Sequence, residues 1–263
     1  MNAIHPTALV APEATLGRNV TVGAYTVIGP DVTIGDGTEI GSHTLIEGET
    51  HIGRNNRIFS HAVIGSIPQD LKYRGEKVRL EIGDDNIIRE FTLINPGTEG
   101  GGGVTRIGNG NLLMGYVHVA HDVIIGNRCI LANAATLAGH VELGDHVVIG
   151  GMTPIHQFVH IGDYAMIAGA SALSQDIPPF CLAEGNRAHL RGLNLTGLRR
   201  QLDRETIDAL KQAYRRLFES GEPLRESAEA LLTDQENPAV EKLCQFILES
   251  QRGIPFKRKN NVQ

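Results

Sequence analysis

The chain has 263 residues, of which 41% are hydrophobic and 21% are charged, and its mean hydropathy is -0.11. These values exclude a disordered chain, and no run of 18 apolar residues is present that could cross a membrane. The formal net charge of -6 divides unevenly, with -9 on residues 1–186 and +3 on residues 187–263. A basic C-terminal third favours a local anionic partner, a nucleotide or an acidic protein, over general nucleic-acid binding, although a solvated helical face would also produce it.

The N-terminus and the cysteines indicate the compartment. The first residues, MNAIHPTALV, lack the basic and apolar blocks of a signal peptide, so we expect a cytoplasmic protein. The three cysteines, Cys129, Cys181 and Cys244, are far apart and no CxxC pair is present. We therefore interpret them as free core thiols and expect neither a disulfide framework nor a zinc ribbon.

A repeat of six residues organises the first two thirds of the chain. An aliphatic residue recurs at every sixth position over residues 4–64, 82–94 and 107–173. All 26 positions are Ile, Leu or Val, and glycine directly follows 13 of them. This pattern indicates short strands separated by tight corners. Three strands make one triangular turn of 18 residues, and stacked turns bury an aliphatic column, as in a hexapeptide parallel β-helix.

Two polar segments interrupt the repeat, residues 66–80 and 96–106, and we expect both to be loops that leave the prism. The second contains the run Gly100–Gly103, which we interpret as a flexible excursion. It is not a phosphate-binding loop, because neither a Gly-Lys-Ser/Thr sequence nor a predicted helix follows it. With these interruptions, residues 1–178 form one predicted β-helix domain.

The pattern becomes helical after residue 178. Asp203 is a suitable N-cap for a helix that stops at Gly221, and Asn237 opens another that stops at Gly253. A shorter helix is predicted within residues 223–234, and residues 257–263 are expected to be frayed. Residues 179–263 are thus a predicted small α-helical domain.

Histidines gather where three consecutive turns of the predicted coil stack. Positions spaced by 18 residues share a column on the coil. The histidines and their column neighbours lie beside or just after an aliphatic position, so we expect their side chains outside the core. One column holds His121, Gly139 and Gln157, the next holds Asp122, His140 and Phe158, and His118 and His156 flank them.

Three interpretations of this cluster stay open on spacing alone. In the first, His121 is a general base held by a carboxylate, and the backbone N–H of Gly139 binds a developing oxyanion. Imidazole titrates near neutral pH and therefore suits removal of a hydroxyl proton. In the second, three imidazoles bind zinc and activate water. In the third, the histidines are surface residues without a catalytic task, as His43 and His61, also 18 apart, could be.

Four motifs, HVAHD, LAGH, IHQF and QDLKY, stand out in the coil and its first loop. On these motifs the chain resembles, over almost its whole length, the UDP-N-acetylglucosamine O-acyltransferase family of lipid A biosynthesis. It implies a left-handed coil and a homotrimer with its sites between subunits. The implied reaction, the first step of lipid A biosynthesis, moves an (R)-3-hydroxyacyl group from acyl carrier protein to the 3-hydroxyl of UDP-N-acetylglucosamine. Direct attack is implied, with no covalent acyl-enzyme, no cofactor and no metal.

The resemblance also assigns roles to individual residues. It implies that His121 is the general base, that Asp122 orients it, and that the Gly139 N–H stabilises the oxyanion. Gly169 matches the position that limits acyl-chain length, and its missing side chain implies a longer acyl group. The residues implied to contact the sugar nucleotide are Asp70, Lys72, His118, His140, His156, Gln157, Asn194 and Arg200.

Two departures from the family pattern concern substrate contacts rather than the reaction. Asn95-Pro96 stands where some members have His-Arg near the cleft, and Thr196 stands where some have Glu close to the ribose. The basic C-terminal part, including Arg215 and Arg216, is expected to dock the acidic carrier protein. Of the alternative classes, the related N-acyltransferases carry an extra N-terminal domain, and carbonic-anhydrase-type hydratases lack the helical domain and the QDLKY loop.

Overall fold

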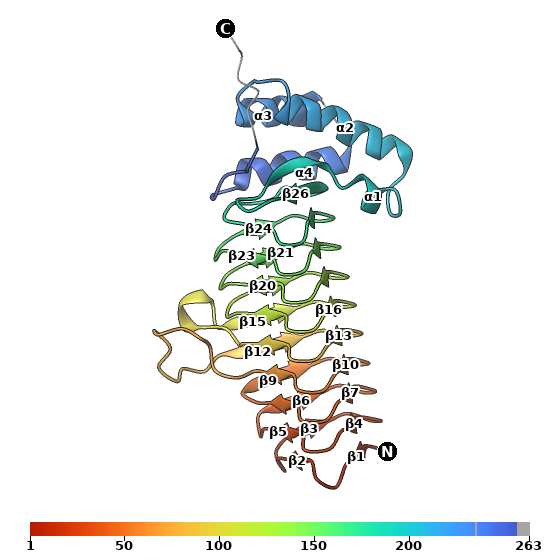
Figure 1. The fold of residues 1–263 in the computed structure, drawn as a ribbon, viewed down its shortest axis with the longest axis vertical. Helices are drawn as coiled ribbons and strands as arrows, with labels where there is room; N and C mark the ends of the chain where they lie inside the picture. The colour runs from red at the N-terminus through yellow and green to blue at the C-terminus, as the bar shows by residue number, and fades with distance from the viewer. Residues whose placement is uncertain (235, 257–263) are drawn as a thin grey trace.

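A computed structural model describes residues 1–234 and 236–256, and within them the chain forms a triangular column with helices at its C-terminal end (Figure 1). The column is a left-handed parallel β-helix, as the repeat and the resemblance predicted. Within the coil, strands pair in parallel with the strand one turn later, for example β1 with β4, where Ala3 lies beside Thr21. One uninterrupted turn of the coil therefore contains 18 residues. Three sheets, here called A, B and C, form the faces of the column.

The strands are short, mostly of two residues. Sheet A contains β1 (Ala3–Ile4), β4 (Thr21–Val22), β7 (Glu39–Ile40), β10 (Arg57–Ile58), β13 (Ile87–Ile88), β16 (Leu112–Leu113), β19 (Ile130–Leu131), β22 (Val148–Ile149), β25 (Met166–Ile167), β26 (Cys181–Glu184) and β27 (His189–Leu193). Sheet B contains β2 (Leu9–Val10), β5 (Val27–Ile28), β8 (Leu45–Ile46), β11 (Val63–Ile64), β14 (Leu93–Ile94), β17 (His118–Val119), β20 (Thr136–Leu137) and β23 (Pro154–Ile155). Sheet C contains β3 (Thr15–Leu16), β6 (Val32–Ile34), β9 (Glu49–Ile52), β12 (Arg79–Ile82), β15 (Val104–Ile107), β18 (Ile124–Ile125), β21 (Glu142–Leu143) and β24 (His160–Ile161).

The repeated aliphatic residues form the core. Ile46, Ile64 and Leu131 are completely buried, and each such side chain contributes about 1.5–3 kcal/mol to folding. At the N-terminal end the pattern weakens, because the first turn has no turn beneath it and Ile4 remains 44% exposed. The three cysteines are buried and unpaired, which confirms their prediction as core thiols.

The corners use glycine for a different reason than the one predicted. The left-handed conformation falls three residues after the aliphatic position and is adopted by non-glycine residues such as Asp122 (φ 59°) and His140 (φ 62°). The glycine directly after the aliphatic residue instead permits close stacking of turns. A Cβ on Gly35 would lie 2.6 Å from the carbonyl oxygen of Gly53 in the next turn.

Both interruptions leave the column at the same corner, between sheets B and C (Figure 1). The first separates β11 from β12, and the second separates β14 from β15. Each loop is shorter than predicted, because the strand that follows it begins earlier. β12 begins at Arg79 and β15 begins at Val104, and both strands have four residues. The glycine run forms a short 3-10 helix, Glu99–Gly101.

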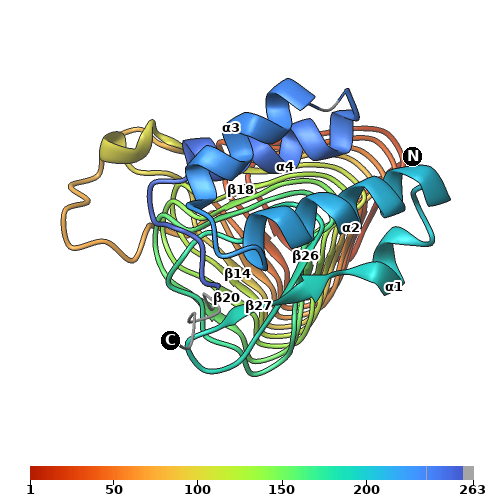
Figure 2. The same ribbon diagram turned by 90° about the horizontal axis from the view of Figure 1, so that it is seen from above.

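The C-terminal part lies across the end of the column (Figure 2). It contains α1 (Leu195–Leu198), α2 (Arg204–Phe218), α3 (Leu224–Asp234) and α4 (Pro238–Glu249). Asp203 and Asn237 cap α2 and α4 as predicted. The sequence missed the hairpin β26–β27, which pairs with β25 and extends sheet A past residue 178. The predicted frayed tail, residues 257–263, lies outside the described residues.

Buried Asp176 ties the end of the helical part to the column. Its carboxylate accepts hydrogen bonds from the backbone N–H of His160 (2.9 Å) and the hydroxyl of Ser250 (2.7 Å). Within residues 1–234 and 236–256, none of the helices combines the length and apolar character needed to span a bilayer.

Candidate active site

A histidine–carboxylate pair lies at the corner between sheets B and C, directly above the two loops. The Nδ1 atom of His121 is 2.8 Å from Oδ2 of Asp122. The imidazole is 15% exposed, whereas the carboxylate is only 1% exposed. The sequence placed both side chains outside the core, but Asp122 is buried because the second loop covers it. A buried carboxylate at this distance holds the Nδ1 proton and directs Nε2 of His121 outward as a potential base.

Thr98 of the second loop supplies most of that cover. Its backbone N–H donates to Oδ1 of Asp122 (2.8 Å), and its hydroxyl donates to Oδ2 (2.6 Å). The backbone N–H of Asp122 donates in turn to the hydroxyl of Thr105 (2.8 Å). Gly101 lies so close that a Cβ there would contact the carboxylate at 2.0 Å. Sequence analysis missed these three residues, and the glycine run was the only signal in the sequence for them.

Gly139 and His140 complete the cluster one turn above His121. A Cβ on Gly139 would lie 2.7 Å from Nε2 of His121, so the ring occupies the space that a side chain would fill. Within the described residues, the backbone N–H of Gly139 makes no hydrogen bond. The His140 ring stands edge-on to His121, with centroids 5.1 Å apart, and stacks on Phe158 at 4.3 Å. The columns predicted from the spacing of 18 are therefore present.

Burial favours the neutral form of two histidines in the cluster. Burial lowers the pKa of His140, and the neighbouring Asp122 carboxylate opposes this effect only in part. Burial also lowers the pKa of His118, whose Nδ1 is buried and has no partner among the described residues. Neutral imidazoles can either donate or accept a hydrogen bond, which suits contacts with sugar hydroxyls.

The remaining predicted residues of this corner surround the cluster. Asp70 and Lys72 of the first loop lie close enough to act electrostatically on His140. His156 and Gln157 are exposed one turn above it, and Nδ1 of His156 is 3.1 Å from the Gln157 carbonyl oxygen. The corner thus brings together the loop and coil residues that the sequence predicted as sugar contacts.

Asn95, one of the family departures, lies beneath this cluster in β14's turn. Its side-chain amide nitrogen donates to the carbonyl oxygens of Ser66 (2.9 Å) and Ile67 (3.1 Å). The buried amide oxygen has no partner among the described residues. Asn95 therefore fixes the start of the first loop beside the cluster.

Three predicted residues lie elsewhere on the molecule. Gly169 belongs to the corner between sheets A and B, next to Gly151. Asn194 caps α1 by accepting from the N–H of Gly197 and donates to the Tyr164 carbonyl, so its side chain is engaged within the fold. Arg200 follows α1 and is exposed, as is Thr196 within it. One chain does not bring these residues to His121.

The cluster can also be tested as a metal site. Ligand atoms of His121, Asp122 and His140 lie within 4.8 Å of one another. However, the two Asp122 oxygens already accept hydrogen bonds from Thr98 and one of them is bonded to His121. A metal ion would have to displace these bonds, so the geometry favours the histidine–carboxylate pair over a metal centre.

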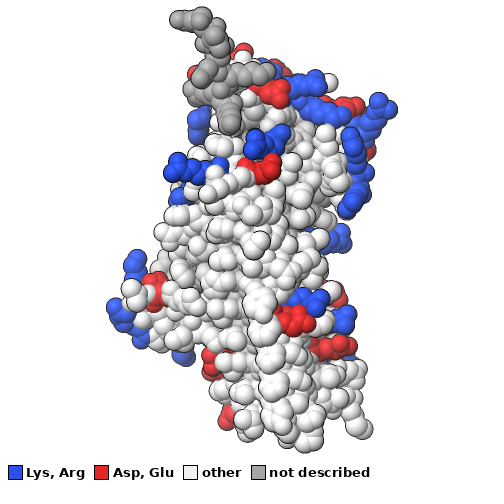
Figure 3. All heavy atoms as spheres, viewed as in Figure 1, with Lys and Arg blue, Asp and Glu red and all other residues white. Residues whose placement is uncertain are grey.

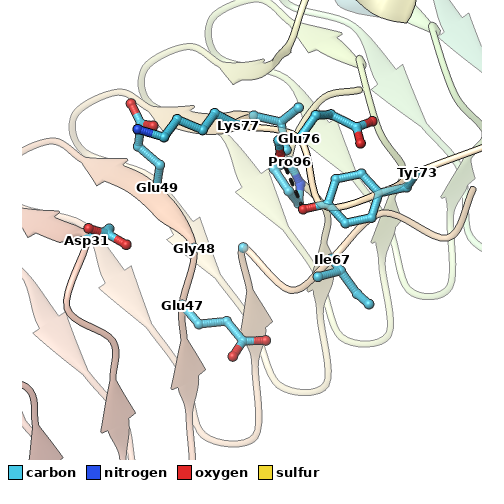
Figure 4. A pocket seen from close by; sticks show the side chains of 11 residues that line it. Asp31, Glu47, Gly48, Glu49, Ile67, Tyr73, Glu76, Lys77 and Pro96 are labelled. Atoms are coloured by element: carbon cyan, nitrogen blue, oxygen red, sulfur yellow. Dashed lines mark hydrogen bonds between the residues drawn. The ribbon is translucent and has the colours of Figure 1, made fainter. Parts of the chain in front are cut away.

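A separate hollow of about 380 Å³ lies under the first loop (Figure 4). Its lining includes the carboxylates of Asp31, Glu47, Glu49 and Glu76, with Lys77 beside them. None of the predicted site residues lines it. The excess of carboxylates makes this hollow unfavourable for a nucleotide diphosphate.

Comparison with known proteins supports the class that the fold and site define. The model of the bacterial transferase hexapeptide matches residues 13–48 and 105–139. The coil is thus that of a hexapeptide-repeat transferase. A second family model, UDP-N-acetylglucosamine O-acyltransferase domain 2, matches residues 176–255.

Similar proteins extend over the whole chain. The acyl-[acyl-carrier-protein]–UDP-N-acetylglucosamine O-acyltransferase of Sulfurovum sp. is 68% identical, over 99% of this chain and 100% of its own length. The UDP-N-acetylglucosamine acyltransferase structure from Campylobacter jejuni is 52% identical, has a TM-score of 0.94, and covers 97% of this chain and 100% of its own. The enzyme from Francisella novicida is 36% identical, also with a TM-score of 0.94, over 97% and 95% of the two chains. This chain belongs to the UDP-N-acetylglucosamine O-acyltransferase family and is an acyltransferase.

Proposed function

We propose that this chain transfers an (R)-3-hydroxyacyl group from acyl carrier protein to the 3-hydroxyl of UDP-N-acetylglucosamine, the first step of lipid A biosynthesis. Family membership supports both substrates, since they form part of its relatives' names. The observation that carries the mechanism is the pairing of His121 with buried Asp122 beside the N–H of Gly139, which has no hydrogen-bond partner among the described residues.

The reaction needs one base, one oxyanion donor and no covalent enzyme intermediate. Nε2 of His121 removes the proton from the sugar hydroxyl as the oxygen attacks the thioester carbonyl. The N–H of Gly139 donates to the oxyanion of the tetrahedral intermediate. When the intermediate collapses, the carbon–sulfur bond breaks and the imidazolium returns the proton to the leaving thiolate. The Asp122 carboxylate beside Nδ1 stabilises the imidazolium.

The arrangement of the corners supports a homotrimer with sites between subunits. The corner between sheets A and B carries Gly169 and exposes Tyr25 (60%), Tyr116 (62%) and Met152 (69%). If this corner of one copy packs against the His121 corner of the next, Gly169 comes beside the reacting groups. Repetition around three copies closes a ring, buries the exposed aromatic column and excludes water from the site.

The helical end is the proposed docking surface for the acidic carrier protein in the cytoplasm. Lys and Arg side chains gather there, whereas the middle of the same face carries few charges (Figure 3). Arg216 is paired with Asp234 at 3.0 Å, but exposed Arg215 has no ion pair within the described residues. Arg215→Glu should therefore weaken the salt dependence of the rate more than Arg216→Glu does.

The first experiment is mass spectrometry of UDP-N-acetylglucosamine incubated with 3-hydroxyacyl carrier proteins of mixed chain length. We expect a 3-O-acylated product from the wild type and none from His121→Ala. His51→Ala is the matched control, since His51 is an exposed histidine on β9, away from this corner. Full product from the His121 variant would contradict the proposed base. Absence of product from well-folded wild-type trimer that contains zinc would support the hydratase instead.

A further inference from the structure

The second loop contains more chain than the coil requires. The corner between sheets B and C is crossed in six residues from Leu137 to Leu143, but in 13 from Ile94 to Ile107. We call residues 95–103 the glycine loop. Since the two turns above, from Val119 to Ile125 and from Leu137 to Leu143, cross this corner without an insertion, the extra residues serve something other than the coil.

The glycine loop is folded around the carboxylate of Asp122. The backbone N–H groups of Gly101 (3.0 Å) and Gly103 (2.8 Å) both donate to the carbonyl oxygen of Thr98, which closes the loop on itself. Thr98 thereby presents its own N–H and hydroxyl to the two carboxylate oxygens. Gly101 lies against the carboxylate carbon at a distance that no side chain allows. Thr98 is itself 95% buried, so water does not compete for these bonds.

We propose that Thr98 is a positioning residue for the acyl transfer, which acts by fixing the Asp122 carboxylate that holds His121. This inference rests on the proposed function of His121 as the base. Two donors from one residue satisfy both oxygens of the buried carboxylate and prevent its rotation. Oδ2 therefore faces Nδ1 of His121, the proton stays on Nδ1, and Nε2 keeps its lone pair toward the substrate hydroxyl.

Thr98→Val tests the proposal because it removes the hydroxyl and keeps the shape of the side chain. Thr98→Ser restores the donor. Thr26→Val is the matched control, since the buried Thr26 hydroxyl donates to the Gly41 carbonyl at 2.6 Å in a distant turn. The variants are compared as full-length protein by steady-state kinetics, thermal melting and ¹⁵N NMR of the His121 ring at pH 8.5.

We expect a single Nδ1–H tautomer of His121 in the wild type and in Thr98→Ser, and a mixture of tautomers in Thr98→Val. The kcat of Thr98→Val should fall about tenfold with KM for the sugar nucleotide unchanged, because one hydrogen bond to a charged group is lost. Thr26→Val should lower the melting temperature and leave kcat and the tautomer unchanged.

A Thr98→Val enzyme with the wild-type tautomer and kcat would overturn the proposal. If that variant does not fold, Gly101→Ala takes its place, because it displaces the glycine loop and retains the Thr98 hydroxyl; it should show the same tautomer mixture, and the wild-type tautomer there would equally overturn the proposal. Failure of the proposed function gives a different result. An active His121→Ala enzyme would refute His121 as the base, whereas the difference in His121 tautomer between the wild type and Thr98→Val would still show whether Thr98 positions the ring.

Discussion

The Cβ atom that Gly139 lacks would lie 2.5 Å from Cε1 of His121 and 2.7 Å from its Nε2. The His121 ring thus rests on the glycine backbone. This relationship requires a residue without a side chain at position 139, whatever role its N–H performs.

Gly139→Ala should therefore lower kcat/KM by about 100-fold, the loss expected when a catalytic group moves by roughly an ångström. The φ of Gly139 lies outside the left-handed region, so alanine fits the backbone and the melting temperature should change little. Gly115→Ala is the control, since Gly115 also follows an aliphatic position by two residues and its nearest neighbour is a side-chain nitrogen at 3.2 Å. Wild-type rates for Gly139→Ala would contradict the contact.

The lowered pKa values of His118 and His140 predict acid sensitivity of the fold. Burial disfavours their charged forms in the folded chain, whereas both bind protons near their ordinary pKa when unfolded. Unfolding therefore takes up protons, and the free energy of unfolding falls as pH drops below about 6.5. Urea titrations at pH 7.5 and 5.5 should show that the free energy of unfolding falls less between these two pH values in His118→Gln than in the wild type. An equal loss in both, with exposed His51→Gln as control, would contradict this assignment.

The coil and its histidine columns could be predicted because a period of six fixes which residues are adjacent. A spacing of 18 places His140 above His121's neighbour Asp122 whatever else the chain does, and it places the aliphatic residues inside. Local capping rules likewise predicted Asp203 and Asn237 at the starts of their helices.

The burial of Asp122 could not be predicted, because it depends on where an irregular loop returns. Thr98 is 24 residues away from Asp122 and lies where the repeat is interrupted, so the period of six does not place it. The hairpin β26–β27 could not be predicted for a similar reason, since its sequence contains no repeat and only β26 pairs with the coil, through β25. Gly169 and Asn194 match a family motif, but adjacency to His121 would depend on a second copy of the chain.

Asp176 provides a test of how the helical end is attached. Asp176→Ala should lower the free energy of unfolding of this end by about 1–3 kcal/mol, since it leaves the donors of His160 and Ser250 without an acceptor. Limited proteolysis should then cut the C-terminal part sooner. Asp234→Ala is the control, because its ion pair with Arg216 is exposed and contributes at most about 1 kcal/mol. Equal protease resistance of both variants would contradict the tether.

Gly169 predicts the length of the acyl group. A Cβ there would meet only the backbone of Gly151, at 3.4 Å and 3.6 Å, so the fold accepts a side chain and the glycine is not required for packing. The missing side chain therefore suits a long acyl chain, and Gly169→Met should shift the ratio of kcat/KM values toward shorter thioesters by about tenfold or more, since each buried methylene is worth about 0.8 kcal/mol. Ala170→Met adds the same bulk at the adjacent exposed position and should leave the ratio unchanged. Competition between carrier-protein thioesters of several lengths measures this ratio directly. A wild-type preference for the shortest thioester, or an unchanged ratio in Gly169→Met, would show that another residue limits the chain.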